Sequence, residues 1–257
     1  MLIAQISDLH VMPAGELAYG RYDTAATLAR CVDSLLRLRP LPALVLATGD
    51  LVEHGTAGEY RRLRGLLAPL PMPVYLIPGN HDARETLRLE FGDHAYLGRA
   101  GTKVGYRVTG NEVCLIALDT VVPEEDGGAL DPAQLDWLAA QLAAGPHTPT
   151  LVLMHHPPFT SGICRLDEIA LDAASAGRLG RIIERHPQVE RIVCGHTHRA
   201  IQARWHGTMV SVCPSTAFQY GIDLRPHAGA VPTAEPPAYQ LHYWNGTGLV
   251  THTVTLA

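Results

Sequence analysis

The sequence predicts a layered α/β fold. Over residues 1–200, short runs of β-branched and aliphatic residues alternate with amphipathic stretches, which is the βαβ pattern, and later residues contain only strand-like segments. The length of 257 residues and the 47% hydrophobic content are typical of a globular chain that buries its core without disulfides. This composition argues against a disordered, fibrous or membrane-embedded protein.

Predicted strands and helices alternate along these residues. Apolar residues recur at helical spacing around positions 28–36, 60–67, 135–142 and 179–183. Asp131 followed by Pro132 predicts a helix start, because Asp is a favoured N-cap and Pro is a favoured first helical residue. The strands predicted between the helices cover residues 2–6, 43–47, 74–77, 113–118, 150–154 and 189–194.

The sequence pattern changes after Gly195. Strand-like segments at 200–205, 209–212, 239–244 and 249–255 flank a loop at 225–237 that is rich in Pro and Gly. We therefore expect a main α/β domain over residues 1–213 and a small β-rich lobe over residues 214–257. Tyr239, Tyr243 and Trp244 in this lobe predict a contact surface for a homodimer or a higher homo-oligomer.

The charge balance and the cysteines limit the possible partners and compartments. Twenty Lys and Arg against 25 Asp and Glu give a net charge of -5, whereas duplex nucleic acid and anionic membranes attract a basic excess. The five cysteines contain no C-x-x-C pair, which argues against a disulfide framework or a structural zinc site. Because the sequence has neither a signal-peptide pattern nor a membrane-spanning apolar run, the expected location is the cytoplasm.

Polar residues follow five of the predicted strands at the points where these strands end. Each group alone has an ordinary explanation, since Asp after Ser is a common helix cap and Gly-Asn is a common turn. Together they indicate a site, because open α/β sheets build their sites at the carboxyl ends of strands. The residues at these ends are Asp8 and His10, Asp50, Asn80 and His81, His155 and His156, and His196 and His198.

This set of side chains predicts a centre for two metal ions. Two of its pairs are spaced i, i+2, which places both side chains of a pair on one side of an extended segment. Imidazole, carboxylate and amide ligands without thiolate favour Fe, Mn, Co or Zn. Seven candidate ligands are enough for two ions, and they are Asp8, His10, Asp50, Asn80, His155, His196 and His198.

Two metal ions at such a centre favour hydrolysis of a phosphoester. Asp50 can bridge the ions, and ions about 3.5–4 Å apart can share a hydroxide whose parent water has a pKa of about 7. This bridging hydroxide would attack phosphorus in line while the cations neutralise the phosphate oxygens. The leaving alkoxide needs a proton, and His81 is the candidate donor because the ordinary imidazole pKa is about 6.5.

Five short blocks in this order resemble the signature of calcineurin-like metallophosphoesterases. They are D-x-H at 8–10, G-D at 49–50, G-N-H-D at 79–82, H-H-P-P at 155–158 and G-H-T-H at 195–198. Segments 19–24, 49–55 and 214–219 are similar to the class III cyclic nucleotide phosphodiesterases and the glycerophosphodiesterases of that superfamily. The resemblance spans roughly residues 1–220, and five ordered blocks are far more specific than one short motif.

The resemblance implies a four-layer α/β/β/α sandwich with a small β-rich C-terminal cap lobe. It implies Fe or Mn as the metal, with Zn or Co as alternatives, and it makes His81 the residue that contacts the phosphate and assists the leaving group. Whether His155 or His156 is the metal ligand stays open at this point. If His155 is the ligand, His156 is expected to orient a ligand or to line the pocket. By resemblance, Asp8, His10 and His198 hold the first metal, Asn80, His155 and His196 hold the second, and Asp50 bridges both.

The expected substrate is a small phosphodiester, such as a 3',5'-cyclic nucleotide like cyclic AMP or a glycerophosphodiester. The alternatives among enzymes are a phosphomonoesterase, a broad-specificity phosphoesterase or a nuclease on the same centre. Lys103 is the only lysine in the chain, which argues against a nuclease that binds duplexes. A metal-binding interaction scaffold is the non-enzymatic alternative, although every candidate ligand position is filled.

Overall fold

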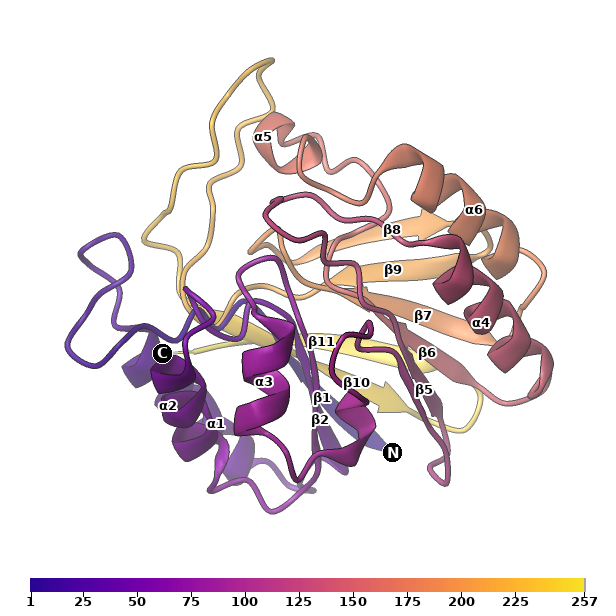
Figure 1. Cartoon of the computed structure of the whole chain (residues 1–257), viewed down its shortest axis with the longest axis horizontal. Helices are drawn as coiled ribbons and strands as arrows, with labels where there is room; N and C mark the ends of the chain where they lie inside the picture. Colours follow the sequence, from indigo (N-terminus) through magenta and orange to yellow (C-terminus); the bar gives the residue numbers. More distant parts are fainter. Residues whose placement is uncertain (257) are drawn as a thin grey trace.

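The computed structural model describes residues 1–256, which form two mixed β-sheets packed against each other (Figure 1). The first sheet has the order β11 (Leu249–Thr255), β10 (Ala238–Trp244), β1 (Leu2–Ile6), β2 (Leu44–Thr48) and β3 (Val74–Ile77). The second has the order β4 (Tyr106–Val108), β5 (Cys114–Ala117), β6 (Thr150–Leu153), β7 (Val189–Cys194), β9 (Thr208–Val212) and β8 (Ile201–Trp205). Strands β1, β2 and β3 run parallel, as do β5, β6, β7 and β9, whereas β10, β11, β4 and β8 pair antiparallel with their neighbours.

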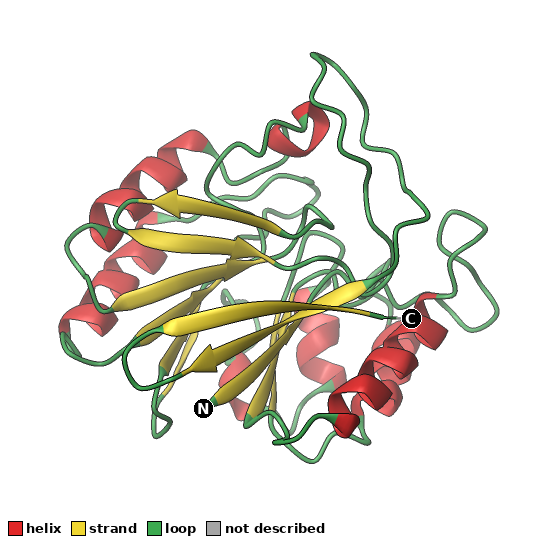
Figure 2. Cartoon of the chain, turned by 180° about the vertical axis from the view of Figure 1, so that it is seen from behind, coloured by secondary structure: helices red, strands yellow, loops and turns green. Residues whose placement is uncertain are grey.

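Helices cover the outer faces of both sheets (Figure 1 and Figure 2). Helices α1 (Thr24–Arg37), α2 (Ala57–Leu67) and α3 (Arg84–Glu90) belong to the side of the first sheet, and α4 (Pro132–Ala143) and α6 (Ala173–Ile183) lie outside the second. Two short helices, η1 (Ala95–Leu97) and α5 (Cys164–Asp167), lie in connecting segments. The expected four-layer sandwich is confirmed. None of the helices within residues 1–256 is both long and apolar enough to cross a bilayer.

Local sequence signals explain where most of these elements begin. The Asp23 side chain caps α1 by accepting from the amide of Ala26, and Asp131 caps α4 as predicted. All five residues of β2 are buried, which is the pattern of a parallel strand covered on both faces. The predicted strands and helices are all present. Helix α3 and strand β4 were not expected, because seven and three residues are too short to show a clear period.

The strands expected in a separate C-terminal lobe belong to the first sheet instead. Strand β10 pairs antiparallel with β1, from Leu2 opposite Tyr243 to Gln5 opposite Gln240, and β11 pairs with β10. Nearly all of β10 is buried, so it completes the sandwich rather than forming a lobe. Of the three aromatic residues expected at a dimer surface, Tyr239 and Trp244 are buried and Tyr243 is exposed. The loop between β9 and β10 projects beside α5 (Figure 1).

Candidate metal centre

The predicted site residues lie where the strand ends of both sheets meet. Asp8 and Asp50 are each the second residue after the ends of β1 and β2, and the pairing of these strands continues into the site. The amide of Asp8 donates to the Gly49 carbonyl at 3.1 Å, and the amide of His10 donates to the Asp50 carbonyl at 2.9 Å. The second sheet contributes the histidines that follow β6 and β7. The site therefore joins the two sheets.

Five of the seven predicted ligands have left-handed backbone conformations. Non-glycine residues rarely adopt this region, which costs on the order of 1–3 kcal/mol for each residue and persists only where the surroundings enforce it. Such residues cluster at functional sites. The φ values are 52° for Asp8, 43° for His10, 47° for Asp50, 74° for His196 and 49° for His198.

Gly195 is required for the close approach of the two sheets at this point. A Cβ atom there would contact the Ser7 hydroxyl and would lie 2.8 Å from Asp8 Oδ2. Gly195→Ala is therefore expected to lower the free energy of unfolding by about 1–3 kcal/mol, the usual cost of overpacking. The midpoint of urea unfolding at an unchanged m-value measures this loss. Gly248→Ala is the control, because a Cβ there meets no described atom within 4 Å; equal midpoints for both variants would contradict the prediction.

The ligand atoms of the predicted set converge on two neighbouring groups. His198 Nε2 lies 3.0 Å from His10 Nε2 and 3.5 Å from Asp8 Oδ1. Asp50 Oδ2 lies between the groups, 3.6 Å from His10 Nε2 and 3.3 Å from His155 Nε2. Asp50 therefore lies within reach of both groups.

The second group is completed by Asn80 and His196. The Asn80 side-chain oxygen lies 3.2 Å from His196 Nδ1. His196 and His155 come from the second sheet and Asn80 follows β3 of the first, so this group also spans both sheets. All seven residues predicted as ligands are therefore brought together in one place.

The hydrogen bonds around the centre leave free nitrogen lone pairs pointing into it. His155 Nδ1 donates to the Thr48 carbonyl at 2.8 Å, and His198 Nδ1 donates to the Phe218 carbonyl at 2.9 Å. Since a carbonyl only accepts, Nδ1 of each ring carries a proton, and in the neutral ring, which is the form that binds metals, Nε2 is available as a ligand. The Nε2 atoms of His155 and His196 are buried and have no hydrogen-bond partner within residues 1–256. Because buried polar atoms are normally paired, these nitrogens fit a bound metal ion.

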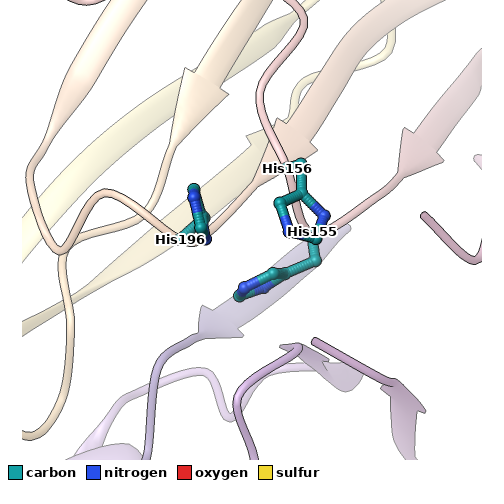
Figure 3. Close-up of side chains that lie close together, drawn as sticks. All are labelled: His155, His156 and His196. Atoms are coloured by element: carbon teal, nitrogen blue, oxygen red, sulfur yellow. The ribbon is translucent and has the colours of Figure 1, made fainter. Parts of the chain in front are cut away.

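His156 differs from its neighbour His155. Figure 3 shows the two rings leaving the same loop in different directions, with their planes 87° apart. His156 Nε2 donates to the Asp126 carbonyl at 3.0 Å, and its Nδ1 accepts from the Thr120 hydroxyl at 2.7 Å. Both ring nitrogens are thereby engaged. This geometry favours His155 as the ligand and His156 as a residue that supports the adjacent 121–128 loop.

The number of metal ions bound per chain distinguishes a ligating histidine from one that supports a loop. His155→Ala is expected to bind one Mn²⁺ fewer per chain than the native protein, because its free Nε2 is lost. His156→Ala is expected to keep the native number, because its ring nitrogens are used elsewhere. Equilibrium dialysis followed by elemental analysis measures both values. The opposite result would assign the ligand to His156.

Burial sets the protonation of the centre. Burial, opposed by the His155 imidazole, raises the pKa of Asp8 to about 6. Burial also disfavours a charged Asp50, but the neighbouring imidazoles of His155, His81 and His10 together outweigh burial and hold the pKa of this carboxyl well below its usual range. Burial lowers the pKa values of His196 and His198 well below that of an ordinary imidazole. These two rings are therefore neutral, which is the form that binds metals.

A cavity of about 320 Å³ opens onto the centre, and His81 lies on its wall. His81 Nδ1 donates to the Glu53 carbonyl at 3.0 Å, and the His81 amide donates to Asp50 Oδ1 at 3.1 Å. This leaves Nε2 of a partly exposed ring free to meet a substrate. The other lining residues include Tyr19, Asp126, Arg165, Leu166, Ile169 and Tyr220.

Sequence reasoning assigns no role to Asp82 or Glu53, although both are close to the centre. Asp82 Oδ2 accepts from the amides of Gly79 at 2.8 Å and Leu51 at 3.0 Å, so it ties the loops after β2 and β3 together. The last letter of the G-N-H-D block was the available signal for Asp82. Glu53 lies three residues after Asp50 and contacts His10.

The four-layer sandwich and its buried centre of imidazoles and carboxylates define the class of metal-dependent phosphoesterases. Residues 1–200 match the calcineurin-like phosphoesterase family, and the chain belongs to this family. A zebrafish (Danio rerio) dimetal phosphatase shares the fold, with a TM-score of 0.71 over 100% of this chain and 99% of that one, at 16% identity.

Curated relatives extend the similarity over nearly the whole chain. The chain is 35% identical to a probable glycerophosphodiester phosphodiesterase GpdQ of Arcobacter nitrofigilis, over 98% of this chain and 92% of the relative. It is 29% identical to the 3',5'-cyclic adenosine monophosphate phosphodiesterase CpdA of Escherichia coli K12, over 88% of this chain and 78% of the relative. The chain is a metal-dependent phosphoesterase whose relatives are phosphodiesterases.

Proposed function

We propose that this protein hydrolyses a small phosphodiester, either a 3',5'-cyclic nucleotide or a glycerophosphodiester, at a centre of two metal ions. The observation that carries the proposal is the position of Asp50 between His10 and His155, with His81 beside it on the cavity wall. The activities named for the relatives support both substrate classes.

The residues at the centre have separate roles in this proposal. The ions, expected to be Fe or Mn with Zn or Co as alternatives, would activate water and neutralise phosphate oxygens. Asp50 is shared between the two ligand groups and holds the amide of His81. His81 directs Nε2 into the cavity, where it can contact the phosphate and protonate the leaving oxygen. The two groups are Asp8, His10 and His198, and Asn80, His155 and His196.

The size and charge of the molecule support a small substrate. A cavity of about 320 Å³ is at the small end of ligand sites, which are typically about 300–1,000 Å³. Its walls carry Arg165, paired with Asp126 at 3.3 Å, and no other Lys or Arg is among the described lining residues. A duplex would need a broad basic surface, whereas the net charge of the chain is -5.

A kinetic panel tests the proposal. Cyclic AMP, cyclic GMP, glycerophosphodiesters and phosphomonoesters are compared side by side on protein reconstituted with Mn²⁺ or Fe²⁺. We expect kcat/KM to be higher for at least one diester than for every monoester. Higher values for monoesters would identify a phosphomonoesterase, and metal binding without hydrolysis of any of these compounds would identify a scaffold.

The same proposal includes a homodimer or higher homo-oligomer in the cytoplasm. Strand β11 is an edge of the first sheet, and the exposed Tyr243 lies on the neighbouring β10, which supports a contact through these C-terminal strands. All five cysteines lie in the described part of the chain as free thiols, as is usual in a reducing compartment. A monomeric mass in solution would contradict the oligomer.

A further inference from the structure

Glu53 contacts the metal centre from a position outside the predicted ligand set. The loop that carries it follows β2 and runs beside the loop that carries His10, because Val11 donates to the Leu51 carbonyl at 3.3 Å and bridges to Val52. Glu53 is therefore held next to the His10 ring by the backbone of both loops.

The contact between Glu53 and His10 is short. Glu53 Oε2 lies 2.6 Å from His10 Nδ1, and the His10 side chain is almost fully buried. A carboxylate accepts the Nδ1 proton, so Nε2 faces the centre, 3.6 Å from Asp50 Oδ2, and it carries the lone pair in the neutral ring that binds a metal. A carboxylate on the far nitrogen of a ligating histidine fixes the ring and raises its basicity.

His10 differs in this respect from two other predicted ligands. The Nδ1 atoms of His155 and His198 donate to main-chain carbonyls, those of Thr48 and Phe218. The Nδ1 atom of His10 faces a charged side chain, so its orientation depends on the residue at position 53. A substitution there changes the ligand without touching the backbone of the site.

Glu53 also contacts the histidine proposed as proton donor. Its main-chain carbonyl accepts from His81 Nδ1 at 3.0 Å, and the rings of His10 and His81 lie 4.8 Å apart. The carboxylate of Glu53 is bonded to His10 and lies farther from His81, with Oε1 3.8 Å from His81 Nδ1, whereas the main-chain carbonyl is the hydrogen-bond acceptor of His81. Replacing the side chain therefore keeps the hydrogen bond to His81 while it removes the one to His10.

We propose that Glu53 is a positioning residue that orients His10 toward the metal ions and thereby sets the affinity of one of the two metal sites. This inference rests on the proposed two-metal function. Its first consequence is that Glu53 acts on metal binding, through the carboxylate on His10. Its second is that an uncharged acceptor at position 53 retains part of the effect, because an amide oxygen still accepts the Nδ1 proton.

The test titrates Mn²⁺ into the metal-depleted full chain by calorimetry. Glu53→Ala is expected to weaken one of the two sites by about 10–100-fold, the usual cost of losing such a partner, and to leave the other unchanged. Glu53→Gln is expected to weaken the same site by less. Excess Mn²⁺ is expected to restore most of the kcat of Glu53→Ala on an aryl phosphodiester.

Glu184→Ala is the matched control. Glu184 pairs with His206 Nδ1 at 2.5 Å, so the variant breaks the same kind of contact away from the centre. Native affinities at both sites of Glu53→Ala would overturn the inference. The inference would also be overturned if Glu184→Ala weakened Mn²⁺ binding as much as Glu53→Ala does. The same holds if Glu53→Ala and Glu53→Gln lost Mn²⁺ affinity to the same extent and also lost thermal stability to the same extent. If the native protein hydrolyses no diester but Glu53→Ala still binds one Mn²⁺ more weakly, the proposed function fails and the role of Glu53 stands.

Discussion

Replacing Asp50 by alanine is expected to lower kcat/KM for a phosphodiester by at least about 10³-fold. Asp50 Oδ2 lies within 3.6 Å of His10 Nε2 and within 3.3 Å of His155 Nε2, so its loss affects both ligand groups at once. A metal ion in a hydrolytic site contributes several kcal/mol of transition-state stabilisation, and about 1.36 kcal/mol corresponds to a factor of ten in rate. Turnover of an aryl phosphodiester with added Mn²⁺ measures the loss.

A control variant distinguishes the loss of the Asp50 carboxylate from a general loss of folded structure. Asp136 is an exposed aspartate on α4 and lies outside the cavity lining, so Asp136→Ala is expected to keep native turnover. Thermal unfolding of both variants shows whether the fold survives. A folded Asp50→Ala variant with native turnover would contradict the proposed function.

Replacing His81 by alanine is expected to slow the reaction most for substrates with poor leaving groups. General acid catalysis contributes about 10²–10⁴-fold, and an alkoxide needs a proton far more than a nitrophenolate does. His81 is suited to this role because Nδ1 is held by the Glu53 carbonyl and Nε2 is left free toward the cavity. We therefore expect a loss of about 10²–10⁴-fold on an alkyl diester and a much smaller loss on a nitrophenyl diester.

His206→Ala is the control for this comparison. The two side chains are similarly exposed, at 35% for His81 and 33% for His206, and both contact a glutamate residue. His206 lies away from the cavity, so its loss is expected to change neither rate. If His81→Ala slows both substrates equally, the proton-donor role is wrong and a role in binding the phosphate stands.

Periodicity and strand-end residues predicted most of the fold and the seven candidate ligands that converge, but not Glu53 or Asp82 beside them. They succeeded because parallel strands buried on both faces are continuous apolar runs, and because the carboxyl ends of such strands meet at one edge. They failed for β10, whose neighbour in the sheet is β1 at the other end of the chain. The local sequence of a strand does not reveal which strand it pairs with, so β10 was assigned to a separate lobe although it pairs with β1.

The choice between His155 and His156 shows a second limit of sequence reasoning. Both follow the same strand, and adjacent histidines have the same chemistry. What distinguishes them is the partner of each ring nitrogen, and the partners Thr120 and Asp126 of His156 lie 36 and 30 residues away in the sequence. The role of Glu53 was hidden for the same reason, because it depends on which nitrogen of His10 faces it.

The distribution of the predicted ligands over both sheets has a consequence for stability. Asp8, His10, Asp50 and Asn80 follow strands of the first sheet, whereas the three remaining ligands follow strands of the second. Ions held by all seven would cross-link the two halves of the sandwich, and their binding free energy would be gained only while the halves stay packed. The metals would then stabilise the packing of the two sheets as well as supply the catalytic centre. Unfolding of the sandwich and release of the ions would therefore be coupled.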